Sequence, residues 1–324
     1  MRVFVAGATG ALGAHLLPLL VEHGHEVIAA GRSSEKLARL RARVTETVAL
    51  DLLDAEAVRR AVTATRPEAI VHQATALAHQ SDFRHFDQTF AATNRLRTQG
   101  TDALLAAARD LGVTRFIAQS YAGWPYAREG ALVKTEEDAL DPHPPAPMRQ
   151  SLSAIRYQEQ VVLKAGGTVL RYGALYGSPD DLQLDPVRKR RFPIIGEGTG
   201  VWSFVHLHDA AAATVLALEA TGGQRAAVYN ITDDEPAPVR EWLPILARAI
   251  GARPPLQVPR WLGRVLGGEA AVAMMVESRG ATNAKFKREL GWTLRYPSWR
   301  QGFVESYAPA SQPAQSPSRR LADA

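Results

Sequence analysis

The chain has 324 residues, of which 46% are hydrophobic and 22% are charged, as is typical of a folded globular protein. It contains no cysteine, which excludes disulfides, thiolate metal sites and cysteine nucleophiles. The formal net charge is +5, but the one dense basic run, residues 188–191, has no interleaved aromatic residues. We therefore expect no nucleic-acid partner.

Strand-like and helix-like patterns alternate along most of the chain. Buried-strand patterns occupy residues 2–6, 26–30, 48–50, 69–72, 115–119, 168–171, 201–205 and 227–231. Helical patterns occupy residues 11–22, about 34–43, 55–65, 93–111, 149–164 and 209–220. This alternation predicts an α/β fold with a parallel, doubly wound sheet.

A glycine-rich turn joins the first predicted strand to the first predicted helix, with Gly7, Gly10 and Gly13 spaced three residues apart. The first glycine permits a tight turn, the second lets a pyrophosphate approach the backbone, and the third lets helix and strand pack closely. The N–H groups that begin the helix then face the phosphates. The pattern predicts a dinucleotide-binding Rossmann domain; a glycine turn without a ligand is the alternative.

The end of the second strand indicates which dinucleotide is bound. Domains that bind NAD place a carboxylate there to hold the ribose 2′-hydroxyl. Here the strand runs into Gly31, Arg32, Ser33 and Ser34, without a carboxylate. The Arg32 guanidinium and the Ser33 hydroxyl suit a 2′-phosphate, so we predict NADP(H) as the cofactor. The alternative is that Arg32 is a surface residue of a less selective site.

The second half of the chain is less regular, which predicts a second part of the molecule. We assign residues 1–176 to the NADP-binding Rossmann domain, to which residues 201–231 return. Residues 177–200 and 232–308 form a smaller C-terminal substrate-binding part, in which the Pro-, Asp-, Arg- and Gly-rich stretch 178–200 is a candidate mobile lid. Residues 309–324 are rich in Pro, Ser, Gln and Ala and predict a disordered tail.

The glycine loop resembles that of the extended short-chain dehydrogenase/reductases, the epimerase/dehydratase group. Further segments resemble that family in the family's own order: residues 51–52, 72–74, 171–177, 202–209, 283–285 and 289–292. Tyr172 stands where the family usually has proline. Together with the glycine loop and Arg32, the resemblance implies cofactor contacts at Gly7, Thr9, Gly10, Ala11, Leu12, Gly13, Arg32, Ser33, Asp51, Leu52, His72, Gln73, Ala74, Gln119, Tyr172 and Gly173.

The chain departs from this family at the catalytic residues. The family's acid is a tyrosine with a lysine four residues later, which lowers the tyrosine pKa and holds the ribose, and a serine or threonine orients the carbonyl. None of the eight tyrosines here has lysine at that spacing. Alignment on Glu159 puts Ser151 at the tyrosine position and Ile155 at the lysine position. Ala122 takes the place of the orienting hydroxyl.

In lacking this pair, the chain resembles atypical members of the family, in particular angucyclinone ketoreductases, which reduce polycyclic aromatic polyketides. Three functions remain open. The first is an NADPH-dependent ketoreductase whose proton comes from the substrate, from water, or from Ser120 or Tyr121. The second is an NADP(H)-binding redox sensor without turnover. The third is a nucleotide-sugar epimerase or dehydratase, which the loss of the strong base argues against.

The expected partner is a small aromatic ketone. Ligands of open α/β sheets bind at the carboxyl edge of the strands, so Trp124, Tyr126 and Trp202 are candidate substrate contacts; core packing is the alternative for each. His206 and His208 have no evident third ligand, so we expect no metal, and Asp209 is a candidate helix cap. No apolar run approaches the roughly 18 residues of a membrane span and no signal-peptide cleavage site is apparent, so we expect a cytoplasmic monomer or homodimer.

Overall fold

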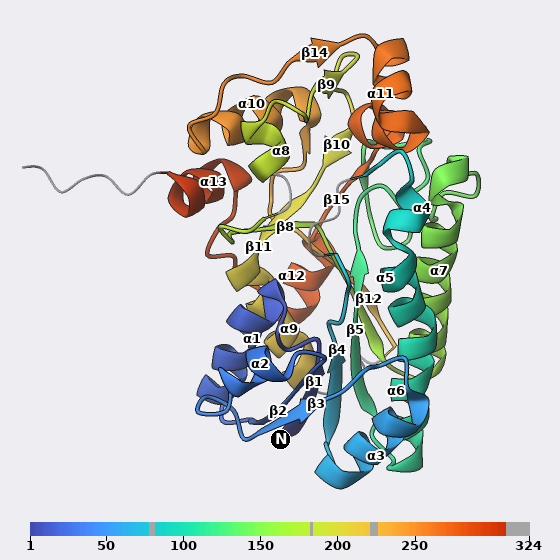
Figure 1. The fold of residues 1–324 in the computed structure, drawn as a ribbon, viewed down its shortest axis with the longest axis vertical. Helices are drawn as coiled ribbons and strands as arrows, with labels where there is room; N and C mark the ends of the chain where they lie inside the picture. Colours follow the sequence, from blue (N-terminus) through green and yellow to red (C-terminus); the bar gives the residue numbers. More distant parts are fainter. Residues whose placement is uncertain (78–81, 182–183, 221–225, 309–324) are drawn as a thin grey trace, which may run out of the picture.

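A seven-stranded parallel sheet forms the centre of the molecule (Figure 1). The computed structural model describes residues 1–77, 82–181, 184–220 and 226–308. The strand order is β12-β7-β5-β4-β1-β2-β3, which confirms the predicted doubly wound sheet. The strands are β1 Arg2–Ala6, β2 Glu26–Gly31, β3 Glu46–Ala49, β4 Ala69–His72, β5 Arg115–Tyr121, β7 Thr168–Tyr172 and β12 Val228–Ile231. The order reverses between β1 and β4, where such sheets open a crevice for a ligand.

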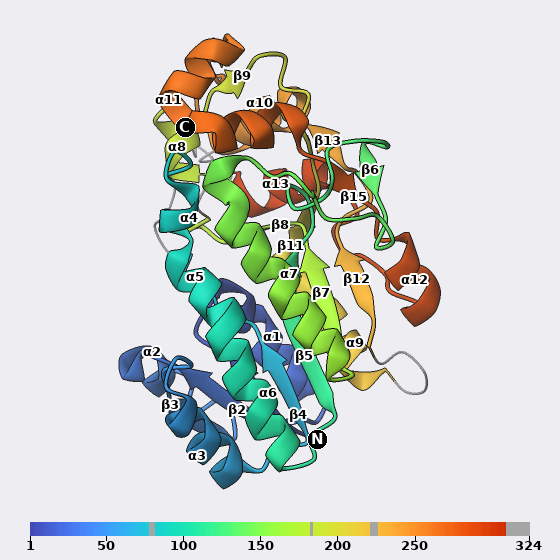
Figure 2. The same cartoon turned by 90° about the vertical axis from the view of Figure 1, so that its right-hand side faces the viewer.

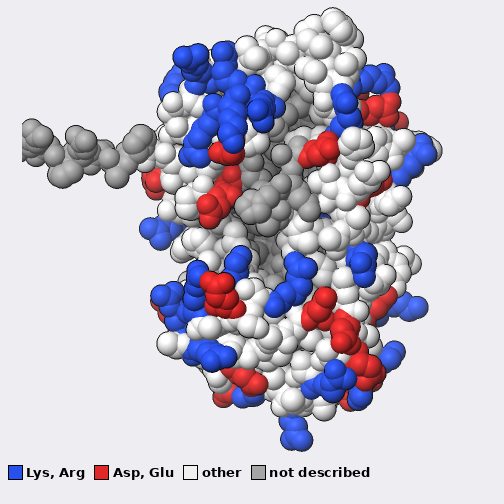
Figure 3. All heavy atoms as spheres, in the orientation of Figure 1, with Lys and Arg blue, Asp and Glu red and all other residues white. Residues whose placement is uncertain are grey.

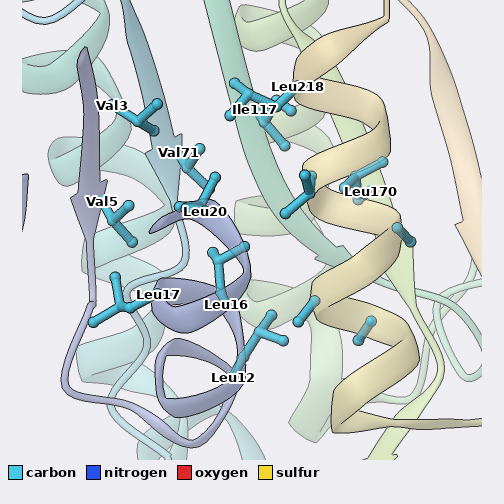
Figure 4. Packing of buried hydrophobic residues seen from close by; sticks show 14 of the residues in the cluster. Val3, Val5, Leu12, Leu16, Leu17, Leu20, Val71, Ile117, Leu170 and Leu218 are labelled. Carbon is cyan, nitrogen blue, oxygen red and sulfur yellow. The ribbon is translucent and has the colours of Figure 1, made fainter. Parts of the chain in front are cut away.

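Helices cover both faces of this sheet (Figures 1 and 2). One face carries α1 Ala11–Glu22 and α9 Leu207–Glu219, which pack against each other. The other carries α3 Ala55–Thr65, α6 Thr101–Asp110 and α7 Arg149–Lys164. The core on the α1 side is continuous and apolar: Leu16, Leu17 and Leu20 of α1 face Val3, Val5 and Val71 of the sheet (Figure 4). Burial on both faces explains why the strand sequences are almost uninterrupted apolar runs.

A second part lies beyond the carboxyl edge of the sheet, opposite the N-terminus (Figure 1). It holds α8 Leu184–Arg188, α10 Val239–Ala249, α11 Arg260–Val272 and α13 Trp299–Tyr307. Trp202, Phe204 and Trp242 pack together at its centre. By contrast, α12 Ala284–Leu290 joins the Rossmann core through Phe286. The sequence had assigned that helix to the substrate-binding part.

Short elements complete the described chain. They are α2 Ser34–Ala38, α4 Phe86–Thr89, α5 Ala91–Arg95, η1 Leu96–Gly100, η2 Ala146–Met148, η3 Ala273–Glu277, β6 Val133–Lys134, β8 Ala174–Tyr176, β9 Ile194–Ile195, β10 Val201–Trp202, β11 Phe204–His206, β13 Ala237–Pro238, β14 Gln257–Val258 and β15 Gly280–Ala281. The small sheets pair β10 with β13, β11 with β8, β14 with β9 and β15 with β6.

Several predicted boundaries are wrong. The second helix ends at Ala38 rather than near residue 43, and the strand predicted at 201–205 is two strands separated by Ser203. The helix predicted at 93–111 runs as α5, η1 and α6, with a π-helical turn in the middle. The stretch 178–200 contains α8 and β9, whose side chains Leu184, Val187 and Ile195 are buried; its role as a lid stays a prediction. The tail 309–324 lies outside the described residues.

The glycine loop gives the first test of this fold. A Cβ added to Gly13 would lie 2.1 Å from the backbone oxygen of Ala8, so even alanine requires the loop and helix to separate. We expect Gly13→Ala to lower the free energy of unfolding by about 1–3 kcal/mol, the usual cost of overpacking. Chemical denaturation measures it, with Ala14→Ser on the exposed side of α1 as control. Equal stability of Gly13→Ala and the wild type would contradict this packing.

Candidate active site

The glycine loop leaves the first turn of α1 open. Gly7 has a φ of +89°, and a Cβ there would lie 2.6 Å from the Ala74 nitrogen, so only glycine lets the loop pack on the segment after β4. Gly10 is the N-cap residue of α1, and no side chain caps that helix. The unpaired N–H groups of the first turn and the positive end of the helix dipole therefore suit a pyrophosphate.

The residues at the end of β2 offer positive charge to a ligand. Arg32 is exposed and makes no hydrogen bond or ion pair with any residue that the structure describes. The Ser33 hydroxyl accepts a hydrogen bond from the Lys36 N–H at 3.2 Å and so caps α2. Asp51 is exposed, and its carboxylate accepts from the Leu53 N–H at 3.0 Å. Arg32 is thus an unengaged cation at this end of the site.

The segment after β4 contains an orphaned acceptor. Burial lowers the pKa of His72 to about 4, so the ring is neutral, and it contacts the Leu96 carbonyl at 3.3 Å. The Gln73 amide donates to the Tyr172 hydroxyl at 3.1 Å, while its Oε1 is buried without a partner. Buried amide oxygens normally accept a hydrogen bond, and a ribose hydroxyl would supply the missing donor. The residues present therefore fit a dinucleotide.

Several predicted cofactor residues have side chains that are engaged within the fold. Tyr172 is buried in the core and its hydroxyl bonds to Thr214 at 2.7 Å, so any cofactor contact at this position is left to its backbone. Leu52 is likewise buried, beside Gly100. Gly173 allows close contact with the Ser203 carbonyl. The others lie along the same edge: Thr9 beside Gly31, Ala11 and Leu12 in the first turn of α1, and Gln119 partly buried in β5.

A buried ion pair occupies the space behind β5. Arg171 binds both carboxylate oxygens of Glu159, at 2.8 and 2.6 Å. Burial works to lower the pKa of Arg171, but the hydrogen bonds and charge of Glu159 outweigh it and raise that pKa. Ser120 donates its hydroxyl proton to Glu159 at 2.7 Å and is 1% exposed. Ser120 therefore does not qualify as a proton donor to substrate, contrary to the prediction.

The residue aligned with the family's tyrosine is also held by contacts within the fold. Ser151 is fully buried in the first turn of α7, where its hydroxyl donates to Asp87 at 2.7 Å and accepts from the Asn94 amide at 3.0 Å. Ile155, one turn later, is fully buried among apolar side chains. Neither of these two side chains offers an acid or base to a ligand.

Tyr121 is the remaining hydroxyl at the end of β5. Its side chain is partly buried, and its phenol makes no hydrogen bond to any described residue. Desolvation raises the pKa of Tyr121 above its usual value, so the phenol keeps its proton at neutral pH. A protonated phenol without a partner can donate a hydrogen bond to a ligand oxygen. Ala122, beside it, is buried and carries no hydroxyl.

The three aromatic residues predicted to contact substrate have different surroundings. Trp124 is partly buried, 6.4 Å from the Tyr121 ring and 5.2 Å from that of Phe86. Tyr126 is fully buried and its hydroxyl is held by Asn230 and Arg171, so the prediction that it lines a pocket is wrong. Trp202 is 8% exposed and donates to the Met274 carbonyl, as a core residue does. Only Trp124 keeps surface for a ligand.

Two other motifs have structural roles. His206, not Asp209, caps α9, by accepting from the His208 N–H at 3.0 Å. Asp209 instead accepts from the backbone N–H groups of Arg295 and Tyr296. In the described ranges, no three His, Asp or Glu side chains are grouped so that they could hold a metal. The basic run contributes to the positive surface over α8 and α10, where Arg188, Lys189 and Arg191 are exposed (Figure 3).

The comparison with protein families agrees with this geometry. Residues 3–232 match the NAD dependent epimerase/dehydratase family. The chain belongs to that family. It is an NAD(P)-dependent oxidoreductase of the kind that acts on carbonyl and alcohol groups. Among the described residues, no helix has both the length and the apolar character needed to cross a membrane.

Curated relatives include several reductases. The chain is 39% identical over 310 residues to a 3-diazoavenalumate denitrifying reductase from Streptomyces, covering 93% of this chain and 99% of the relative. It is 28% identical over 263 residues to a 4-hydroxy-2-methyl-3-oxo-4-farnesyl-3,4-dihydroquinoline-1-oxide ketoreductase from Stigmatella aurantiaca, covering 78% and 74%. The UDP-glucose 4-epimerase from Thermotoga maritima, solved with UDP-glucose, shares the fold at 23% identity, a TM-score of 0.75 and 95% and 97% coverage.

The Glu159–Arg171 pair gives a test of stability. Arg171→Met leaves a buried carboxylate without its counter-charge, so we expect a loss of about 3–5 kcal/mol in the free energy of unfolding. Arg39→Met, which breaks the exposed Arg39–Glu35 pair, is the control and should change it by less than about 1 kcal/mol. Equal effects of the two substitutions in denaturant titrations would contradict a central role for the buried pair.

His72 gives a test by pH. The unfolded chain takes up a proton near the ordinary histidine pKa of 6.5, whereas the folded protein does so only near 4. Stability therefore falls as the pH falls from about 6.5 to 4, by up to about 3 kcal/mol from this residue. His72→Gln should flatten that part of the curve of unfolding free energy against pH, and exposed His143→Gln should not. An unchanged slope in His72→Gln would show that other groups cause the dependence.

Proposed function

We propose that this protein is an NADPH-dependent reductase that delivers hydride to an aromatic substrate without a Tyr–Lys couple. The observation that carries the proposal is the helix α7, where Ser151 is held by Asp87 and Asn94 and Ile155 is apolar. Reversible oxidation of a sugar alcohol needs a strong base at this place. Reduction of an activated acceptor needs no such base. The lack of a base at Ser151 and Ile155 therefore disfavours a nucleotide-sugar epimerase or dehydratase.

The proposed cofactor is held by residues of the N-terminal half. The first turn of α1 would bind the pyrophosphate, Arg32 the 2′-phosphate and Gln73 Oε1 a ribose hydroxyl. A reduced nicotinamide, when bound, supplies a hydride to the acceptor. The preference for NADPH over NADH rests on Arg32 and on the absence of a carboxylate at the end of β2.

An aromatic acceptor is favoured by the wall next to Tyr121. The rings of Phe86 and Phe90 stack at 4.3 Å, and Phe86 meets Trp124 edge to face at 5.2 Å. Phe90 and Trp124 are both only partly buried. Such rings offer flat apolar contact to a planar ligand. A polycyclic aromatic ketone, as in the angucyclinone ketoreductases, is therefore the first candidate substrate.

Reduction of a ketone needs a proton on oxygen as well as hydride on carbon. In the proposed reaction the Tyr121 phenol donates its proton to the developing alkoxide and regains one from water. An internal hydrogen bond from a phenol of the substrate would stabilise the same oxygen. The raised pKa of Tyr121 keeps the group protonated before the step.

An aryl diazonium is the second candidate, because the relative at 39% identity is named a denitrifying reductase of 3-diazoavenalumate. In that reaction hydride replaces dinitrogen on a ring carbon, so the charges balance without any proton. A site without a proton-transfer couple meets this requirement directly. Ketones and diazonium compounds are therefore the two acceptors to be compared, and the absence of turnover with either would favour an NADP(H) sensor.

Tyr121→Phe distinguishes the two acceptors. We expect this variant to reduce aromatic ketones roughly 10²-fold more slowly, as loss of a general acid does, and to leave diazonium reduction unchanged. NADPH oxidation is followed optically, with product analysis for alcohol or for the denitrified arene. The control is Tyr157→Phe, since Tyr157 is exposed and bonded to Asp102. Wild-type ketone rates in Tyr121→Phe would show that the proton comes from substrate or water.

Arg32→Ala tests the cofactor. Loss of charge-assisted hydrogen bonds to a 2′-phosphate should weaken NADPH binding by roughly 10- to 100-fold and leave NADH binding unchanged. Titration calorimetry measures both dissociation constants, with exposed Arg39→Ala on the next helix as control. An equal loss for both cofactors, or no loss, would refute the NADPH assignment.

A further inference from the structure

A buried arginine without a partner lies beside this site. Arg97 belongs to the π-helical turn η1 and is 8% exposed. It makes no hydrogen bond or ion pair with any residue in the described ranges. Its nitrogens are not among the fully enclosed unsatisfied atoms, so they still reach solvent. Buried charges are costly unless something compensates them, and π-helical turns are frequent at functional sites.

The contacts between two helices place Arg97 at the height of Ile155. The α5–η1–α6 helix runs beside α7 (Figure 2), with Asn94 bonded to Ser151 and Thr101 bonded to Gln158. In each pair the two bonded residues are 57 positions apart in the sequence, so the two helices keep one register. Arg97 lies between the two contacts, in the turn η1 that packs against α7, and therefore at the level of the α7 turn that contains Ile155. The Leu96 carbonyl contacts His72, which fixes this height at the carboxyl end of β4.

The charge of Arg97 is not used by the fold. Burial lowers the pKa of Arg97 to about 10, so the guanidinium is still a cation at neutral pH. Glu159 attracts it, but both carboxylate oxygens of Glu159 already bind Arg171. One turn before Arg97, the Asn94 Oδ1 atom is a buried acceptor without a donor. A donor and an acceptor thus stand unpaired near each other on one helix.

We propose that Arg97 and Asn94 bind the hydroxyl groups of the nicotinamide-side ribose, with Arg97 as the fixed positive charge that Ile155 does not supply. A hydroxyl both donates and accepts, so it satisfies the Arg97 donors and the Asn94 acceptor together. A carboxylate of the substrate would satisfy only Arg97 and would leave the Asn94 acceptor unpaired, and the negative charge of Glu159 disfavours it. Arg97 is here a positioning residue. This inference rests on the proposed use of a nicotinamide dinucleotide.

The test compares a whole cofactor with its adenosine half. Arg97→Met should weaken NADPH binding by roughly 10- to 100-fold and leave binding of 2′,5′-ADP, which lacks the nicotinamide ribose, unchanged. NADH and 5′-AMP form the parallel pair if the protein prefers NADH. Arg97→Lys should restore part of the NADPH affinity. Exposed Arg95→Met on the same helix is the control and should change neither ligand.

Thermal unfolding without ligand separates binding from folding. Replacing an unpaired buried cation by an apolar side chain should leave the melting temperature unchanged or raise it. Equal NADPH affinity in Arg97→Met and wild type, or equal loss of NADPH and 2′,5′-ADP, would overturn the proposal. So would a raised KM for substrate with unchanged cofactor affinity. Failure of the wild type to reduce any aromatic acceptor would refute the proposed reductase but not this binding comparison.

Discussion

The buried Glu159–Arg171 ion pair determines which polar groups are left for chemistry at the carboxyl edge of the sheet. It connects α7 to β7, and through Ser120 and Tyr126 it also connects β5 and the Asn230 side chain of β12. The carboxylate of Glu159, the hydroxyls of Ser120 and Tyr126 and the Asn230 Oδ1 atom are all engaged within this network. The Asn230 Nδ2 atom is buried without a partner. The pair is bidentate and enclosed, the arrangement in which removal of one partner costs most.

What this network leaves free decides the class of reaction. Around the first turn of α1 and the ends of β4 and β5, the groups without a partner among the described residues include the Tyr121 phenol, Gln73 Oε1 and the N–H groups that begin α1. These groups donate or accept hydrogen bonds, but none has a pKa suited to remove a proton from an alcohol at neutral pH. The site is therefore matched to reduction, in which the driving force comes from the cofactor and the protein orients the acceptor.

The sequence predicted the features that depend on local pattern. Apolar periodicity located the sheet strands because they are buried on both faces, and the spacing of Gly7, Gly10 and Gly13 located the first turn of α1. The sequence also shows that no tyrosine has lysine four residues later, since this concerns only residues that are close along the chain. These features need no knowledge of which distant segments meet.

Contacts between distant segments could not be predicted in the same way. Ser120 follows an apolar run that ends at the site, and nothing in its neighbours shows that Glu159 takes its hydroxyl. Tyr126 follows Trp124 closely in sequence, yet its hydroxyl is enclosed by Arg171 and Asn230. Among the residues that the sequence reasoning missed are Asp87 and Asn94, which hold Ser151 from other helices. No spacing rule would have found them.

Arg97 shows most clearly why packing has to be known. An arginine beside an apolar helix stripe normally extends its stem over the surface and keeps its charge in water. Here α7 lies over that side of the helix, and the π-helical turn shifts the residues that follow relative to those that precede it. A positive charge absent from α7 in the sequence is thus present on the facing helix in the folded chain. The position of a charge in space, rather than in the alignment, decides whether a site can hold an oxygen-rich ligand.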